Sequence, residues 1–196
     1  MTVKPTRSEL LKLKKRIVLA KKGHELLKKK QDSLIIEFFK LLKEVKERHR
    51  ALQETYASAS RQMDHARALE SDLRIKAAAI AVQEAAPVQL DIRNIAGVRV
   101  PMVTRIEQER ERPLYDTLLL QETGGAYSKV LELVIDLAAK ETALRKLLIE
   151  IRKTKRRAHA LEHIFIPELI ATRDRIVMNL EERSREEFTR LKMRKK

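Results

Sequence analysis

The sequence contains no cysteine and no tryptophan among its 196 residues, and aromatic residues make up only 4% of it. The absence of cysteine excludes disulfide bonds and thiolate metal sites, and it fits a cytosolic protein. The scarcity of bulky apolar side chains disfavours a broad globular core and favours an elongated helical assembly with a narrow apolar seam. No apolar run approaches the roughly 18 residues of a membrane-spanning helix. Lys and Arg also interrupt the apolar core that an N-terminal signal peptide would need. We therefore expect no direct membrane insertion.

Positive charge is abundant and unevenly distributed. The formal net charge is +15, of which residues 1–50 carry +10 and residues 140–196 carry +8, whereas residues 51–139 carry −3. If the two ends of the chain lie side by side, they form one strongly positive end, and the mildly acidic middle forms the other.

The first long helix is predicted by a start signal and a repeat. Thr6 and Glu9 have the spacing of a capping box, with Pro5 just before them. From Leu10 to Leu73, alternating steps of three and four residues reach nineteen positions, of which fourteen are apolar. A seven-residue repeat of this length predicts a left-handed coiled coil. We interpret the polar positions as fixing the register of the pairing; they are His24, Gln31, Arg48, Thr55 and Gln62.

A second long helix is predicted from about Ser128 to the C-terminus. Its apolar positions keep one heptad phase as far as Phe165: Val130, Leu133, Leu137, Leu144, Leu147, Ile151, Ala158, Leu161 and Phe165. Beyond Pro167 the stripe moves to a new phase: Leu169, Thr172, Ile176, Leu180 and Glu187. The ring of Pro167 would clash with the carbonyl group of His163, so we expect a bend at this point.

Two matched helices on one chain most simply fold back on each other. The predicted fold is therefore all-α: a long antiparallel two-helix left-handed coiled coil, with residues 1–80 paired with 125–196 and residues 81–124 as the connector. A short apolar helix is expected from Pro113 to Leu120, followed by a break at Gly124-Gly125.

The connector also contains the pattern of a β-hairpin over residues 88–103. Apolar and other residues alternate on both sides of Ala96-Gly97, which is predicted as a two-residue turn. Pro101 predicts an edge strand. The hairpin residues that we single out as candidates for partner contacts are Val88, Leu90, Ile92, Gly97, Val98 and Val100.

No pattern in the sequence supports catalysis. Residues 159–163 match the His-x-x-Glu-His pattern of some zinc proteases, but that pattern needs a third ligand from a folded pocket, and we interpret both histidines as solvent or seam residues. Gly124-Gly125 is not followed by the Lys-Ser/Thr of a phosphate-binding loop. We therefore predict no catalytic site, no cofactor and no metal.

The sequence has two basic runs, Lys14-Lys15-Arg16 and Lys28-Lys29-Lys30, which can be interpreted in three ways. They could be solvated helix faces, surfaces that bind phosphate groups, or surfaces that face an acidic protein partner. The sequence pattern alone leaves these alternatives open.

Two stretches resemble a known family. Residues 156–169 (RRAHALEHIFIPEL), together with Pro5-Thr6-Arg7-Ser8-Glu9-Leu10, look like the D subunit of the archaeal A-type and related V-type rotary ATPases. His159 departs from the family pattern, which usually has Asn there. The resemblance extends over nearly the whole chain, because residues 10–46 and residues 158–192 both resemble that family.

The resemblance implies a function that the residue patterns alone do not. In this family the D subunit is the non-catalytic axle of the central stalk. It transmits torque between the membrane ring and the catalytic hexamer of A and B subunits, and it also contacts the F and C subunits. The implied location is peripheral, at the cytoplasmic face of the membrane, with no homo-oligomer and no nucleic acid. We predict that the basic end faces the hexamer, through Lys14, Lys15, Arg16, Lys192 and Lys195.

Two alternative functions remain. A prefoldin-like chaperone also pairs terminal helices around central hairpins, but it offers apolar tips, whereas residues 190–196 here include five Lys and Arg. A basic coiled coil that binds nucleic acid would need interleaved aromatic residues or a recognised fold, and aromatic residues are few.

Overall fold

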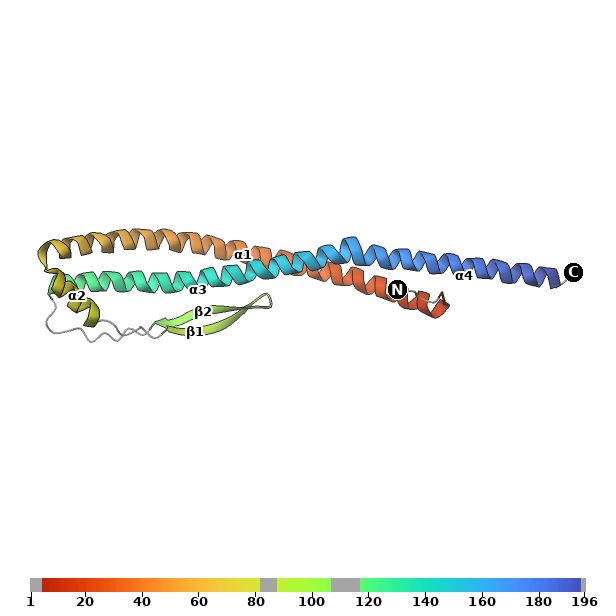
Figure 1. Ribbon diagram of the computed structural model, residues 1–196, viewed down its shortest axis with the longest axis horizontal. Coiled ribbons are helices and arrows are strands. Elements are labelled where there is room, and N and C mark those ends of the chain that lie inside the picture. The colour runs from red at the N-terminus through yellow and green to blue at the C-terminus, as the bar shows by residue number, and fades with distance from the viewer. Residues whose placement is uncertain (1–4, 82–87, 107–116, 195–196) are drawn as a thin grey trace. The chain divides into compact units, whose positions relative to one another are not determined.

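A computed structural model describes residues 5–81, 88–106 and 117–194 of the chain. The elements in chain order are α1 (Arg7–Leu69), α2 (Asp72–Ala81), β1 (Val88–Ile95), β2 (Val98–Ile106), α3 (Leu118–Ala160), a π-helical turn η1 (Leu161–Phe165) and α4 (Ile166–Arg194) (Figure 1). The predicted class is confirmed: long helices dominate, accompanied by one two-stranded antiparallel hairpin and one short helix. None of the helices in the described ranges is long and apolar enough to cross a membrane.

The chain divides into two compact units, each built from segments distant in sequence. Unit 1 comprises residues 1–33 and 151–196, and unit 2 comprises residues 34–150. In each unit a stretch of α1 pairs with a later helix that runs in the opposite direction.

The core of unit 1 is the predicted seam. Leu13, Ile17 and Ala20 of α1 are buried, as are Ala158 of α3 and Ile176 of α4. The helix begins where the capping signal predicts, because the backbone N–H of Glu9 donates to the Thr6 side-chain oxygen at 3.3 Å.

Unit 2 has a buried apolar seam of its own. Leu34 and Leu147 are completely buried, and the smaller Ala59 and Ala66 let the helices approach closely near the end of α1. All six buried apolar residues of α1 lie at positions that the heptad steps reach: Leu13, Ile17, Ala20, Leu34, Ala59 and Ala66.

The first helix is shorter than predicted. The heptad pattern runs on to Leu73, but α1 ends at Leu69, and Leu69 and Leu73 are both exposed. Residues 72–81 form the separate helix α2, so the prediction of one continuous helix as far as Leu73 is wrong. The apolar pattern continues through the break because α2 is also helical.

The second long helix begins earlier than predicted. The expected break at Gly124-Gly125 is wrong, because α3 starts at Leu118 and runs through both glycines without interruption. Leu118, Leu119 and Leu120 begin this long helix rather than ending a short one, and residues 113–116 lie outside the described residues. Glycine lowers helix stability by about 1 kcal/mol, an amount that packing of a long helix readily offsets.

Candidate functional site

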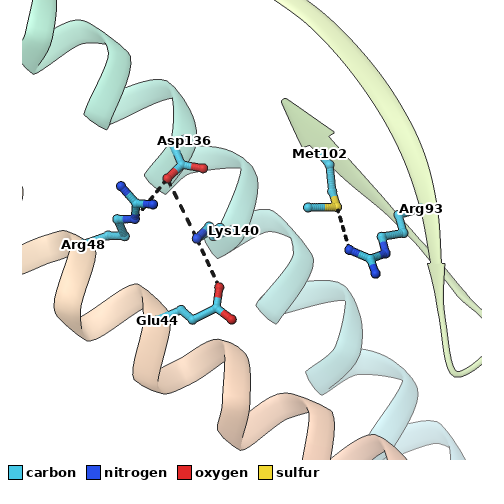
Figure 2. Close-up of polar contacts among 6 residues, drawn as sticks. All are labelled: Glu44, Arg48, Arg93, Met102, Asp136 and Lys140. Carbon is cyan, nitrogen blue, oxygen red and sulfur yellow. Dashed lines mark hydrogen bonds and ion pairs between the residues drawn. The ribbon is translucent and has the colours of Figure 1, made fainter. Parts of the chain in front are cut away.

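Four charged side chains link α1 to α3 in unit 2. Arg48 Nε lies 3.4 Å from Asp136 Oδ2, and Lys140 Nζ lies 3.1 Å from Glu44 Oε2 and 3.9 Å from Asp136 Oδ2 (Figure 2). From Glu44 to Arg48 the residue number rises along α1, whereas that of the partner falls from Lys140 to Asp136 on α3. This order shows that the two helices are antiparallel. Arg48 is the polar seam residue predicted to fix the register, and the ion pair with Asp136 supports that role.

The β-hairpin forms as predicted, with a two-residue turn. Ala96 and Gly97 adopt φ values of 50° and 86°, and two positive φ angles are the mark of the turn that suits a twisted hairpin. Ile95 pairs with Val98 next to the turn, and a register shift between Gln89 and Leu90 marks a bulge near the open end.

The pairing register places the two apolar stripes of the hairpin on opposite faces. Leu90 is opposite Val103 and Ile92 is opposite Pro101, whereas Val100 is opposite Arg93. Directly opposed residues share a face, so Leu90 and Ile92 lie on the face away from Val100.

The two faces differ in burial. Val100 is completely buried, and Lys146 Nζ of α3 donates to the Arg99 carbonyl oxygen at 3.4 Å, so one face of the hairpin packs in unit 2. On the other face Leu90 and Ile92 are 60% and 74% exposed. The sequence pattern predicts the apolar alternation but not this asymmetry, because alternation alone does not tell which of two apolar faces is covered.

A polar contact joins the end of α1 to the start of α3. The Thr117 hydroxyl donates to Glu70 Oε1 at 2.8 Å, and Arg74 Nη1 lies 3.3 Å from Glu70 Oε2. The hydrogen bond from Thr117, assisted by Arg74, holds the pKa of Glu70 below its ordinary value, against a smaller opposing effect of burial. Thr117 also begins α3, since its carbonyl oxygen accepts from the Gln121 N–H. No sequence pattern pointed to this contact, because 47 residues separate the two partners.

In unit 1, the π-helical turn η1 explains the change in heptad phase. The N–H of Ile166 donates to the Leu161 carbonyl oxygen, one residue further back than in an α-helix. The seam therefore steps five residues from Leu161 to Ile166, and Phe165, which we predicted to lie in the seam, is 48% exposed instead. The prediction for Phe165 is wrong because a heptad count assumes uninterrupted α-helix.

Pro167 directly follows this turn. The sequence predicts a bend at Pro167; what the structure has at this point is a π-helical turn immediately before α4. Pro167 is the second residue of α4, and it has no N–H to continue the helical ladder that the π-helical turn already interrupts here.

Three histidines and one glutamate cluster at this turn. His24 Nε2 of α1 lies 3.3 Å from Glu162 Oε2, and His163 Nε2 lies 3.7 Å from the same oxygen. The rings of His159 and His163 are 4.3 Å apart, between centroids. In the part of the chain that the structure describes, no three His, Cys, Asp or Glu side chains are arranged to hold a metal ion. The contact between His24 and Glu162 instead links α1 to η1, and His24 is another of the polar seam residues.

The predicted hexamer contacts do not form one cluster. Lys14, Lys15 and Arg16 are exposed on α1, and Lys192 is exposed near the end of α4; Lys195 lies outside the described residues. Because His24 lies opposite Glu162, the antiparallel pairing brings Lys14 level with about residue 172 of α4. Lys192 is 20 residues further along the chain, or about 30 Å of helix.

Past the paired part, the end of α4 is exposed on all sides. Every described residue from Glu181 to Arg194 is exposed, and Figure 1 shows α4 extending beyond the N-terminal end of α1. Glu187, predicted to lie in the seam, is therefore exposed to solvent. We call residues 181–194 the C-terminal extension.

Comparison with known proteins identifies the family. The family model described as the D subunit of ATP synthase matches residues 9–196. The D subunit of the A-type ATP synthase of Methanoregula boonei is 41% identical over 97% of this chain and 94% of its own length. That of Methanosarcina acetivorans is 42% identical over 97% and 94%, and that of Pyrococcus horikoshii is 41% identical over 98% and 92%. The chain belongs to the family of ATP synthase D subunits.

Proposed function

We propose that this chain is the central-stalk rotor subunit of an A-type ATP synthase and transmits torque between a membrane ring and a catalytic hexamer of A and B subunits. The observation that carries the proposal is the family match over residues 9–196, which spans both compact units. The rotor itself does no chemistry on nucleotide. A chaperone or a nucleic-acid-binding protein gains no support from any of the relatives found.

The construction of the helices suits torque transmission. The helix α1 has 63 residues, and residues 118–194 form a helical run of 77 residues. In each unit, part of α1 and part of this run are antiparallel around a buried apolar seam. Twisting one helix against the other would pull buried residues such as Leu34 and Leu147 out of contact. Cross-helix ion pairs at Arg48 and Lys140 resist sliding along the seam.

The paired termini in unit 1 are the part that we assign to the hexamer, and the middle of the chain is the part that we assign to the F subunit. Leu90 and Ile92 support the second assignment, because an exposed apolar face on a hairpin is suited to burial against a partner. The C subunit is the expected partner at the base, at the cytoplasmic side of the membrane.

The test of the rotor assignment is purification from the native host. A tag on this chain should recover the A and B subunits from detergent-solubilised membranes, together with ATP hydrolysis activity that the isolated chain lacks. Recovery of ribosomes or of small hairpin chaperones, without the A and B subunits, would contradict the assignment.

The test of the assignment to the F subunit uses the two hairpin faces. Leu90→Ser combined with Ile92→Ser removes the exposed apolar face and should weaken binding of the purified F subunit at least tenfold. The matched control is Asn94→Ser, which changes an exposed residue on the same face without removing apolar surface. Unchanged affinity in the double variant would place the F subunit elsewhere.

A further inference from the structure

Basic side chains outnumber acidic ones around the π-helical turn. Residues 21–32 and 150–165 together hold ten Lys and Arg against four Asp and Glu. Nine of the ten are exposed, and we call them the basic belt: Lys21, Lys22, Lys28, Lys29, Arg152, Lys153, Lys155, Arg156 and Arg157.

The pairing register brings the two halves of the belt together. His24 lies opposite Glu162, so an antiparallel partner places Lys28 and Lys29 level with Arg157 and its neighbours. The belt therefore occupies only about 20 Å of the helix pair. All nine residues belong to unit 1.

These cations differ from Arg185 and Arg190 of the C-terminal extension in having no carboxylate partner within the described ranges. None of the nine makes an ion pair with residues 5–81, 88–106 or 117–194. In the C-terminal extension, by contrast, Arg185 pairs with Glu181 and Arg190 with Glu186, and the five Lys and Arg of that extension face four Glu. The belt thus carries an excess of positive charge that no ion pair within the described part of the chain offsets.

An apolar pair lies within the belt. The π-helical turn leaves Ile164 65% exposed and Phe165 48% exposed, and the register places both level with Lys21 and Lys22. An apolar centre with a charged surround is the usual composition of a protein-binding surface. A nucleic-acid surface would need aromatic side chains for stacking, and Phe165 is the one aromatic residue at the belt.

We propose that the basic belt and the pair Ile164–Phe165 form the principal docking surface for the inner wall of the catalytic hexamer. The complementary part of that wall would have carboxylates around an apolar patch. The inference rests on the proposed rotor function and moves the main electrostatic contact from Lys192 to the belt. Carboxylates on the partner would neutralise charges that the described residues leave unpaired, so the contact weakens as salt rises.

The test compares two sets of four charge removals in the full-length chain. The belt variant is Lys28→Gln, Lys29→Gln, Arg156→Gln and Arg157→Gln. The control variant removes equal charge elsewhere in unit 1: Arg175→Gln, Arg183→Gln, Arg185→Gln and Arg190→Gln. All eight side chains are exposed, so helix content and melting temperature should stay at the wild-type values, which circular dichroism checks.

Binding to a hexamer of A and B subunits, assembled without the stalk, is measured from low to high salt. At low salt the belt variant should bind roughly 30-fold more weakly and the control less than about threefold more weakly, since each exposed charge contributes a few tenths to one kcal/mol. High salt should remove the difference between the wild type and the belt variant. Equal losses in the two variants would overturn the proposal, because net charge alone would then explain binding.

A second variant tests the apolar centre separately. Ile164→Ser with Phe165→Ser should weaken binding about tenfold at every salt concentration, because screening does not act on apolar contact. Wild-type affinity in this variant would overturn the apolar part of the proposal. Tighter binding of the wild type to poly(U) RNA than to the hexamer at physiological salt would overturn the choice of partner. Failure of the wild type to bind the hexamer at any salt would instead contradict the rotor function itself.

Discussion

In unit 2, Lys140 contacts Glu44 and Asp136, and Arg48 contacts Asp136, so charges of opposite sign meet across the helix pair. In unit 1, His24 Nε2 lies 3.3 Å from Glu162 Oε2 across the seam, and none of the nine cations of the basic belt has a carboxylate partner among the described residues. The same two antiparallel helices therefore use charge to fix register in one unit and leave charge available for a partner in the other.

The largest expected effect concerns the buried seam of unit 2. Leu147→Ala should lower the free energy of unfolding by about 2–5 kcal/mol, because the side chain is completely buried and its removal leaves a cavity. Ile149→Ala, two residues away and 51% exposed, is the matched control and should change it by much less. Denaturant unfolding measures both. Equal effects would mean that the seam does not determine stability.

The next effect separates the π-helical turn of unit 1 from ordinary helix. Deleting Ile164 should convert η1 to α-helix and keep Ile166 and Ile176 in the seam, so stability should change little. Deleting Arg175 instead rotates Ile176 out of the seam and should cost about 1.5–3 kcal/mol, the value of burying such a side chain. Thermal melting compares the two deletions. A larger loss from the Ile164 deletion would show that the π-helical turn is itself needed for stability.

Glycine substitutions compare the two units directly. A Cβ atom added at Gly23 in unit 1 or at Gly124 in unit 2 would meet no atom within 4 Å, and both glycines lie inside long helices. Gly23→Ala and Gly124→Ala should each stabilise their helix by about 0.5–1 kcal/mol. The unit whose substitution raises the melting temperature more is the one that unfolds first. Gly97→Ala is the contrasting control, because φ of 86° disfavours a Cβ atom and should make this change destabilising.

A smaller effect is expected from the ion pairs of unit 2. A double-mutant cycle on Glu44→Gln and Lys140→Met should give a coupling free energy of about 0.2–1 kcal/mol, since the Glu44 side chain is 53% exposed. Raised salt should reduce this coupling. A coupling of zero at low salt would mean that the contact does not contribute to the register.

The smallest effect concerns the contact between Glu70 and Thr117. The folded pKa of Glu70 is lowered, so its stabilising contribution is fully present above the pKa of an unfolded glutamate, about 4.3, and is lost as the pH falls through the folded value. Thr117→Val should lower the melting temperature slightly at neutral pH and have less effect in acid. Thr117→Ser, which keeps the hydroxyl, is the control. If the melting temperatures of Thr117→Val and Thr117→Ser differ by the same amount at every pH, the effect comes from packing at the start of α3.

Much of the fold was predictable because the relevant signals are local. The heptad steps identified the buried residues of α1, and Ala96-Gly97 identified the turn of the hairpin. The break at Gly124-Gly125 was wrong because helix propensity is a weak preference that tertiary packing overrides. The assignment of Phe165 failed for a different reason: a single π-helical turn shifts every later position by one residue.

The candidate surfaces were less predictable because they depend on pairing. Lys28 and Arg157 are distant in sequence, and only the register set by His24 and Glu162 brings them level. The exposed face of the hairpin likewise depends on which residue opposes which, and a one-residue change of register would exchange the two faces. Lys14, Lys15, Arg16 and Lys192 remain predicted contacts that only the complex can test.

The C-terminal extension has a consequence for how the protein enters an assembly. Residues 181–194 continue a helix that is already nucleated, but each added turn without tertiary contacts is only weakly favourable in water. The ion pairs of residues 181–194 among the described residues are intrahelical. Their amide hydrogens should therefore exchange with solvent much faster than those of residues 166–180 in the isolated chain. If another subunit of the complex contacts residues 181–194, binding would order these last turns, and part of the binding free energy would be used to complete the fold of the chain itself.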